Sequence, residues 1–265
     1  MNRNKERMLD FLVKAFIADS DNYKNMEIPE DETQKKVVLR SLMNIRMPRK
    51  MDDEVLKVQD EYLKLCAEEK GIVELKDIPI IKDVFSIWQG DITRLKVDAI
   101  VNAANSIMLG CWAPMHLCID NQIHTYAGIQ LRYDCNEKMQ ELKKKYGQDY
   151  EQPTAVPMLT GAYNLPSKKV IHIVGPIVYG ELTKELEKEL ADCYEKTLDM
   201  CLENGLKSVA FCCISTGEFR FPKERAAEIA IDTTKKWVLE HPLAMDRIIF
   251  NVFKDEDKKY YEKMI

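Results

Sequence analysis

The sequence predicts an α/β protein, built as a three-layer α/β/α sandwich and preceded by a helical extension. Two observations predict this fold class. After residue 75, short apolar runs alternate with longer segments of helical periodicity, as strands and helices do when they follow in turn. Before residue 75, only helical periodicity is found. With 265 residues, 46% of them hydrophobic, the chain can bury one substantial core and a smaller second one.

The extension, residues 1 to 75, is expected to form three helices. Apolar residues recur at helical spacing in three groups; the second follows Pro29, and the third follows Asp52 and Asp53. The groups are Leu9, Leu12, Val13, Phe16 and Ile17; Val38, Leu42 and Ile45; and Val55, Val58, Tyr62 and Leu65. Because this segment holds no cluster of chemically active side chains, we expect it to pack on the main domain or on a partner.

The main domain, residues 76 to 265, contains five apolar runs that we expect to be strands buried on both faces. These runs are 84 to 88, 99 to 102, 170 to 175, 209 to 215 and 248 to 253. Helices are expected at 121 to 132, 136 to 146, 182 to 203 and 222 to 239. In such a fold, ligands bind at the carboxyl ends of the strands, so the loops that follow strands are the places to look for function.

Composition excludes some classes of function. The net charge of −5 argues against a protein that binds the phosphate backbone of nucleic acid, although backbone amides could still bind a small anion. No segment approaches the ~18 apolar residues of a membrane span, and the first residues lack the long apolar core of a secretory signal. We therefore expect a cytoplasmic protein whose eight cysteines are thiols or metal ligands rather than disulfides.

One loop after an expected strand carries two carboxamides. In VNAANS, residues 101 to 106, Asn102 and Asn105 follow the strand end directly. A carboxamide can both donate to and accept from a sugar hydroxyl, which a leucine or a carboxylate cannot do equally well. Asparagine also ends strands for turn geometry alone, so both interpretations stay open.

A second loop, ISTGEFRFP at residues 214 to 222, runs from an apolar strand into a helix. Ser215, Thr216 and Gly217 can turn successive backbone N–H groups toward an anion, and the helix N-terminus adds a favourable dipole. A diphosphate would suit this arrangement. The loop lacks the glycines and the lysine of the common nucleotide fingerprints, and a plain strand-to-helix turn is the alternative.

A third stretch supplies candidate metal ligands. Cys111, His116 and Cys118 have the spacing C-x4-H-x-C, and thiolates with imidazole are the ligands that zinc favours. Three ligands leave a position open for water or substrate, as in catalytic zinc sites. A closed structural site remains an alternative if a distant cysteine completes it, and free thiols beside an unrelated histidine are another. The candidates for a fourth ligand are Cys135, Cys193, Cys212 and Cys213.

Together these loops resemble a known family. The segments WQGDITRLKVDAIVNAANSIML, YNLPSKKVIHIVGP and ISTGEFRFP are similar to the macrodomains, which are ADP-ribose-binding α/β/α modules with a mixed central sheet. The C-x4-H-x-C insert and the helical extension resemble the zinc-containing branch. Members of that branch hydrolyse ADP-ribose from modified proteins and often accompany sirtuin-type ADP-ribosyltransferases. The resemblance covers residues 76 to 265 and implies one Zn2+ ion per chain.

The resemblance also implies roles for single residues. Asp91 and the Ile92 amide should meet adenine, with Phe253 stacked on it. Asn105, with Asn102, should face the distal ribose. The phosphate loop corresponds to Ser215, Thr216, Gly217, Glu218 and Phe219. Two departures stand out: CWAPMHLC replaces a glycine run, and Arg220 stands where a glycine is common.

These residues suggest a mechanism at the distal ribose. Zinc held by Cys111, His116 and Cys118, with one open position, suits hydrolysis of an ADP-ribosyl ester of Asp or Glu. Asp120 would orient or deprotonate water, with Asn105 positioning the ribose; capping the following helix is the alternative for Asp120. We expect His124 and His172 to be structural.

Two other functions fit the same loops. A reader would bind ADP-ribose without cleaving it and would use zinc only to brace the loop. An esterase would act on free O-acyl-ADP-ribose with the same residues. Whether the protein is a hydrolase or a reader, its expected partner is a mono-ADP-ribosylated protein. We expect neither nucleic acid nor a membrane to be a partner.

Overall fold

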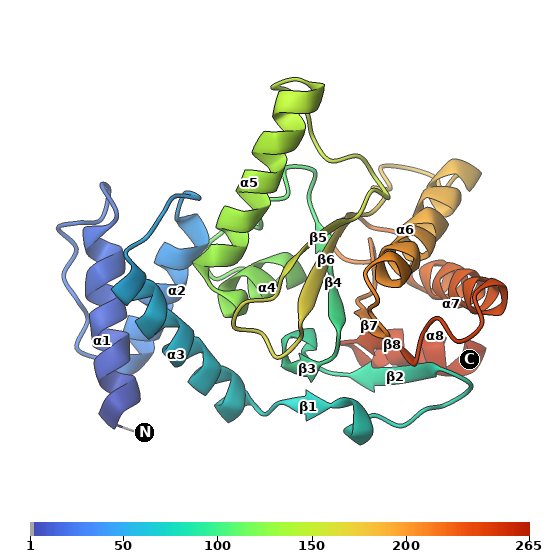
Figure 1. Cartoon of the computed structure of the whole chain (residues 1–265), viewed down its shortest axis with the longest axis horizontal. Coiled ribbons are helices and arrows are strands. Elements are labelled where there is room, and N and C mark those ends of the chain that lie inside the picture. Colours follow the sequence, from blue (N-terminus) through green and yellow to red (C-terminus); the bar gives the residue numbers. More distant parts are fainter. Residues whose placement is uncertain (1–2) are drawn as a thin grey trace.

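The computed structural model describes residues 3 to 265 and places a helical extension beside an α/β sandwich (Figure 1). The extension consists of α1 (Arg3–Ala18), α2 (Glu32–Ile45) and α3 (Asp53–Lys70), so the three expected helices are confirmed. Asp31 caps α2 by accepting from the backbone N–H of Gln34, and Asp52 caps α3. Both carboxylates satisfy amides that a helix start leaves free.

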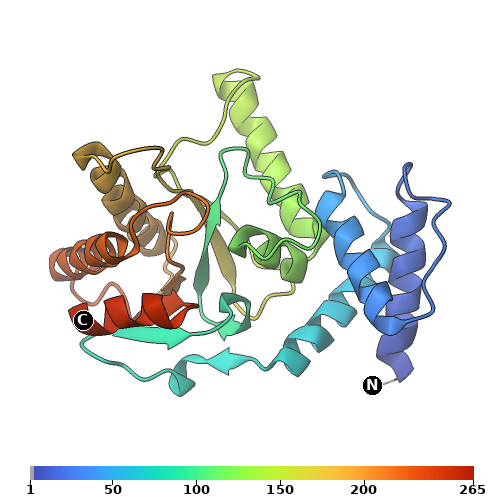
Figure 2. The ribbon, with the colours of Figure 1, turned by 180° about the vertical axis from the view of Figure 1, so that it is seen from behind.

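The extension has a hydrophobic core of its own. Eight of the twelve positions of the helical pattern are buried in this core, and the other four are partly buried and pack against it. One residue of the sandwich, Ile129, belongs to the same cluster. The extension is therefore joined to the sandwich by apolar packing. Figure 2 shows the three helices gathered against the side of the sandwich that carries α4 and α5.

The sandwich is built on a six-stranded mixed sheet. The strand order is β2-β8-β7-β4-β6-β5, with β5 antiparallel to β6 and the other pairs parallel. The strands are β2 (Phe85–Gln89), β4 (Ala99–Ala104), β5 (Met158–Gly161), β6 (Lys169–Val174), β7 (Ser208–Phe211) and β8 (Arg247–Val252). All five expected strands are confirmed. The sequence missed β5, an edge strand that alternates buried and half-buried residues over only four positions. A small second sheet pairs β1 (Val73–Glu74) with β3 (Leu95–Lys96).

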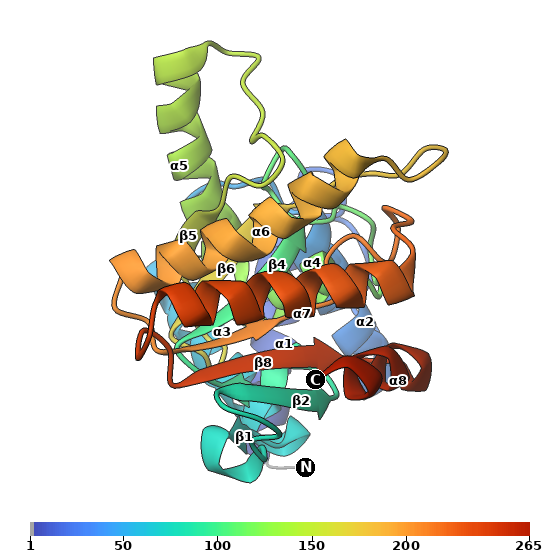
Figure 3. The same ribbon diagram turned by 90° about the vertical axis from the view of Figure 1, so that its right-hand side faces the viewer.

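Helices flank this sheet. They are α4 (Ile119–Ala127), α5 (Ile129–Tyr146), α6 (Lys184–Glu203), α7 (Lys223–Glu240) and α8 (Asp255–Met264). In Figure 1, α4 and α5 lie on one side and α6 and α7 on the other, while Figure 3 shows α6 and α7 side by side. Two single turns of 3-10 helix, Leu75–Asp77 and Ile92–Arg94, complete the elements. In residues 3 to 265, no helix is long and apolar enough to cross a membrane.

The helix expected at 121 to 132 is in fact two helices. Gly128 separates α4 from α5 and has a φ of 97°, a conformation that a residue with a Cβ rarely adopts. A Cβ there would also lie 2.8 Å from the Gln59 side chain of the extension. α5 therefore starts at residue 129 instead of the expected 136. The sequence also missed α8, in which only Asp257 and Tyr261 are buried, too few for a clear periodic pattern.

Candidate active site

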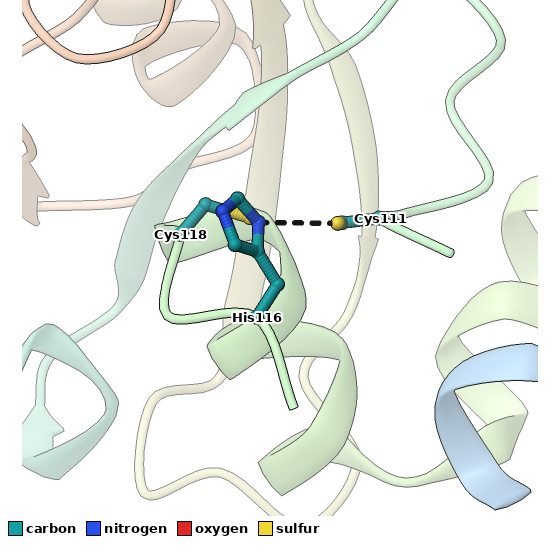
Figure 4. A group of neighbouring side chains, drawn as sticks. All are labelled: Cys111, His116 and Cys118. Carbon is teal, nitrogen blue, oxygen red and sulfur yellow. Dashed lines mark hydrogen bonds between the residues drawn. The ribbon is translucent and has the colours of Figure 1, made fainter. Parts of the chain in front are cut away.

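The loop between β4 and α4 brings three candidate metal ligands together. The Sγ of Cys111 lies 3.4 Å from the Nδ1 of His116, and Figure 4 shows Cys118 beside them. The ligand atoms of all three side chains lie within 4.8 Å of one another, and each side chain is half-buried. Cys118 also caps α4, since its Sγ accepts from the Asn121 N–H at 3.5 Å. The cluster is thus formed by one loop and the first turn of one helix.

The chemistry of this donor set fits a divalent ion. Burial raises the pKa of the Cys118 thiol to about 12, with a further contribution from Cys111, so two thiolates here would need a cation to stabilise them. Among the described residues, no fourth His, Cys, Asp or Glu places its ligand atom in the group. The arrangement favours an open three-ligand site over a closed one.

A second group of possible ligands fits a metal poorly. His124, Cys135 and His172 are buried together inside the sandwich. The Nδ1 of His172 accepts from Asn102 at 3.0 Å, so the Nε2 of His172 carries the proton and donates to the Thr160 hydroxyl at 3.0 Å. His172 has no lone pair left for a metal, and burial lowers its pKa to about 3. We interpret this group as part of the core.

Asp120, in the first turn of α4, is a buried carboxylate with an exposed fraction of 5%. Asn102 donates to its Oδ1 at 2.8 Å, and Asn105 contacts its Oδ2 at 3.4 Å. Burial raises the pKa of Asp120 to about 6, against the hydrogen bond from Asn102 and the charge of Arg132, which lower it. His124 lies 3.5 Å from the same Oδ1, but burial, followed by the charges of His172 and Arg132, lowers the pKa of His124, so it faces Asp120 uncharged.

The two asparagines of the β4 loop have different environments. Asn102 is fully buried, and its amide donates to Asp120 and His172, so this side chain orients the carboxylate and is not open to a ribose. Asn105 is half-buried and also donates to the Gly110 carbonyl at 3.2 Å. Asn105 therefore links the carboxylate to the residue that precedes Cys111.

The expected phosphate loop lies between β7 and α7. Among the described residues, no hydrogen-bond partner is found for the backbone N–H groups of Gly217, Glu218 and Phe219, or for the buried hydroxyl of Ser215. Unpaired donors in front of a helix N-terminus suit an anion. Arg220 has a φ of 59°, the left-handed region that glycine favours, which explains why glycine would suit this position. Thr216 turns inward and donates to the Cys213 carbonyl at 2.9 Å.

The expected adenine end lies at β2 and the turn after it. Asp91 caps the 3-10 turn by accepting from the Thr93 N–H at 2.9 Å, and it forms an ion pair with Lys70 of α3. Burial alone would raise the pKa of Asp91, but hydrogen bonds from Lys70 and Thr93 and the Lys70 charge outweigh it and lower the pKa. Ile92 is buried, and Phe253 is 72% exposed just beyond β8, where a flat ring is free to stack.

Sequence reasoning missed several residues that hold these loops. Asn251 of β8 donates to the Gly90 carbonyl at 2.9 Å and so fixes the turn before Asp91. Arg132 of α5 is buried, donates to the Leu109 carbonyl at 2.7 Å, and stacks on the Trp112 ring at 4.2 Å. No sequence signal marks a buried arginine, because arginines on helices are mostly exposed.

Comparison with known proteins agrees with this geometry. A Macro domain model matches residues 101–230. The chain is 48% identical to the protein-ADP-ribose hydrolase of Treponema medium, over 98% of each chain. It is 38% identical to the protein-ADP-ribose hydrolase of Staphylococcus aureus strain MSSA476, over 99% of this chain and 96% of that one.

Solved structures agree as well. The Trypanosoma brucei macrodomain in complex with ADP-ribose is 27% identical, with a TM-score of 0.64, and the match covers 89% of this chain and 96% of that one. The similarity to the two hydrolases includes the helical extension, because it spans nearly the whole chain. The chain therefore belongs to the Macro domain family.

Proposed function

We propose that the protein is a zinc-dependent hydrolase that removes mono-ADP-ribose from modified proteins, at ester linkages to Asp or Glu. One observation carries this proposal: Asn105 contacts the buried Asp120 at 3.4 Å and the carbonyl of Gly110, the residue before Cys111 of the three-ligand group, at 3.2 Å. A protein that only bound ADP-ribose would need neither an open metal site nor a carboxylate beside it.

The binding side of the proposal rests on unpaired polar groups. The amides of Gly217, Glu218 and Phe219 and the Ser215 hydroxyl would bind the diphosphate, and their lack of partners among the described residues supports this. Asp91 and the Ile92 amide would bind adenine under the exposed ring of Phe253. Asn105, the more accessible asparagine, would contact the distal ribose.

Cys111, His116 and Cys118 would hold one Zn2+ ion. When bound, this ion would polarise a carbonyl and lower the pKa of a coordinated water toward ~7. The half-burial of the three side chains supports access from solvent. Because the group has no fourth ligand among the described residues, one position would stay open for water or substrate.

Asp120 would act on the attacking water. Its Oδ1 is occupied by Asn102 at 2.8 Å, whereas Oδ2 has only the long contact with Asn105, so Oδ2 is the atom that would accept a proton. Asn102 would keep the carboxylate in one orientation. The neutral His124 behind it would exclude water from the buried side of the carboxylate.

The modified protein would come from an ADP-ribosyltransferase, the class of enzyme that transfers ADP-ribose to protein side chains. A sirtuin-type transferase in the cytoplasm is the partner we propose, on the resemblance to the zinc-containing branch. Neither nucleic acid nor a membrane enters the proposed reaction.

The proposal is tested with three probes offered to the zinc-loaded protein. These are a peptide mono-ADP-ribosylated on glutamate, O-acetyl-ADP-ribose, and free ADP-ribose. We expect release of ADP-ribose from the peptide, measured by chromatography, and loss of release after zinc removal. Binding of free ADP-ribose without turnover of either ester would show a reader instead, and turnover of O-acetyl-ADP-ribose alone would show an esterase.

A further inference from the structure

Helix α2 of the extension contacts the backbone on both sides of the central ligand, His116. The Oδ1 of Asn44 accepts from the Met115 N–H at 3.1 Å. The Nη2 of Arg40 donates to the His116 carbonyl at 2.8 Å. The peptide group that precedes the Met115 Cα and the one that follows the His116 Cα are therefore both tied to one helix, 71 and 76 residues away in the chain.

These contacts belong to a connected polar network. The same Nη2 of Arg40 donates to the Asn121 side chain at 2.9 Å, and Asn121 donates to the Ala113 carbonyl at 2.9 Å. Asn44, which is 1% exposed, donates to the Thr125 hydroxyl at 2.9 Å. The network thus joins α2, the ligand loop and α4, and every bond in it falls within ordinary hydrogen-bond lengths.

The ligand loop needs such support because its backbone is strained. Met115 has a φ of 61°, in the left-handed region that is costly for a residue with a Cβ. Leu117, between two ligands, is 78% exposed and gains little from packing. Neither apolar burial nor regular secondary structure holds residues 113 to 117 in place. Hydrogen bonds from α2 supply that restraint.

We infer that α2 is part of the metal site, and that Arg40 and Asn44 are positioning residues that hold His116 in its ligating orientation. This inference rests on the proposed metal-dependent function and extends it to the extension, whose role the sequence leaves open. Groups behind a metal ligand fix its direction, and their loss typically lowers metal affinity about 10-fold to 100-fold.

The test compares variants of the full chain, prepared metal-free and then titrated with Zn2+ against a chromophoric chelator. Arg40→Met removes the guanidinium but keeps an apolar side chain of similar length. Lys36→Met is the matched control, because Lys36 is on the same helix and, among the residues that the structure describes, forms an ion pair only with Glu32. Arg40→Lys can still donate from its ammonium and serves as the conservative rescue.

We expect Arg40→Met to weaken zinc binding about 10-fold, Arg40→Lys to recover part of that loss, and Lys36→Met to stay within twofold of the native affinity. The visible spectrum of the Co2+-loaded protein should change in Arg40→Met, because the ligand geometry changes. Asn44→Ala should act in the same direction if Arg40→Met does not fold. The melting temperature of each metal-free variant separates a local effect from general loss of stability.

Two results would overturn the inference. One is equal zinc affinity, with an unchanged Co2+ spectrum, in Arg40→Met and Lys36→Met. The other is a native chain that binds no zinc, which would also overturn the metal in the proposed function. A native chain that binds zinc with these differences but releases no ADP-ribose would leave the inference standing and refute only the hydrolase.

Discussion

The amide of Asn102 donates to the carboxylate of Asp120 across 2.8 Å, inside the sandwich, and thereby joins the end of β4 to the first turn of α4. Both side chains are buried. A buried carboxylate without a partner is costly, so this bond stabilises the fold and fixes the direction of the carboxylate at the same time.

Asn102→Leu should separate these two effects. The change leaves Asp120 Oδ1 and His172 Nδ1 without their donor, so we expect a loss of about 1 to 3 kcal/mol in the free energy of unfolding. If Asp120 orients water, kcat should fall about 100-fold while KM changes little. Urea unfolding and steady-state kinetics measure both. Asn164→Leu is the control, since Asn164 is also buried and hydrogen-bonded but lies outside the site. Native kcat in Asn102→Leu would contradict the role we give to this bond.

Zinc binding should depend on Cys111, His116 and Cys118 and should not depend on a half-buried thiol elsewhere in the chain. Cys118→Ser should lower the zinc content of the purified protein from about one ion per chain to near zero, because it removes one of the three proposed ligands. Turnover should be lost with it. Elemental analysis measures the metal, and Cys66→Ser, a half-buried thiol in the extension, should keep it. A full zinc complement in Cys118→Ser would exclude this site.

Gly175 should affect the binding of the diphosphate of ADP-ribose, although it has no side chain to contact it. A Cβ at this position would lie 2.1 Å from the Ser215 Oγ and 2.8 Å from the Ile214 Cγ2, so Gly175→Ala must displace both side chains at the start of the phosphate loop. We expect about 10-fold weaker binding of ADP-ribose by calorimetry, because the loop amides lose their alignment. Gly180→Ala, where a Cβ meets open space, should bind as the native chain does. Equal affinities in the two variants would contradict a role of the Ser215 hydroxyl in binding.

Lys70 should stabilise the extension against the sandwich through Asp91. The pKa of Asp91 is lowered from 3.8, so the stabilisation is full above pH 3.8 and is lost as the pH falls through the lower, folded value. Lys70→Met should therefore cost about 1 kcal/mol at neutral pH and progressively less in acid. Urea unfolding across this range checks the trend. Lys96→Met, which removes a more exposed ion pair with Glu74, should cost less at every pH. A Lys70→Met cost that does not depend on pH would argue against the ion pair.

Acid should also destabilise the protein through His172. Burial lowers the pKa of His172 from 6.5 to about 3. Between these values the unfolded chain binds a proton that the folded chain does not, so the free energy of unfolding falls as the pH drops below 6.5, by about 1.4 kcal/mol per pH unit. His172→Gln should show a shallower fall in urea unfolding than the native chain. Identical slopes in the native chain and His172→Gln would show that His172 titrates normally.

Much of the fold follows from apolar periodicity. The strands β4, β6, β7 and β8 are buried on both faces. Because such strands need apolar residues at successive positions, each of them can be recognised in the sequence as a continuous apolar run. The break at Gly128 was not predicted, because the apolar pattern continues across it. Only the backbone conformation and the close approach of Gln59 reveal why the helix must end there.

The candidate site also has one part that the sequence predicts and another part that only the structure shows. The spacing of Cys111, His116 and Cys118 identified a group that the fold brings together, because the three residues are close in the chain. The sequence could not show that Asn102 lies behind Asp120, or that Arg40 lies against the ligand loop. Such contacts join residues far apart in the chain, and no local pattern records them.

Ile129 opens α5 of the sandwich, yet its side chain completes the apolar core of the extension. Three residues on, Arg132 donates to the carbonyls of Met43 and Arg46 at 3.2 and 2.9 Å. Deletion of residues 1 to 75 would expose Ile129 to water and remove two of the carbonyls that accept from Arg132. We therefore expect a chain without residues 1 to 75 to unfold more readily than the whole chain, although the architecture changes near residue 75.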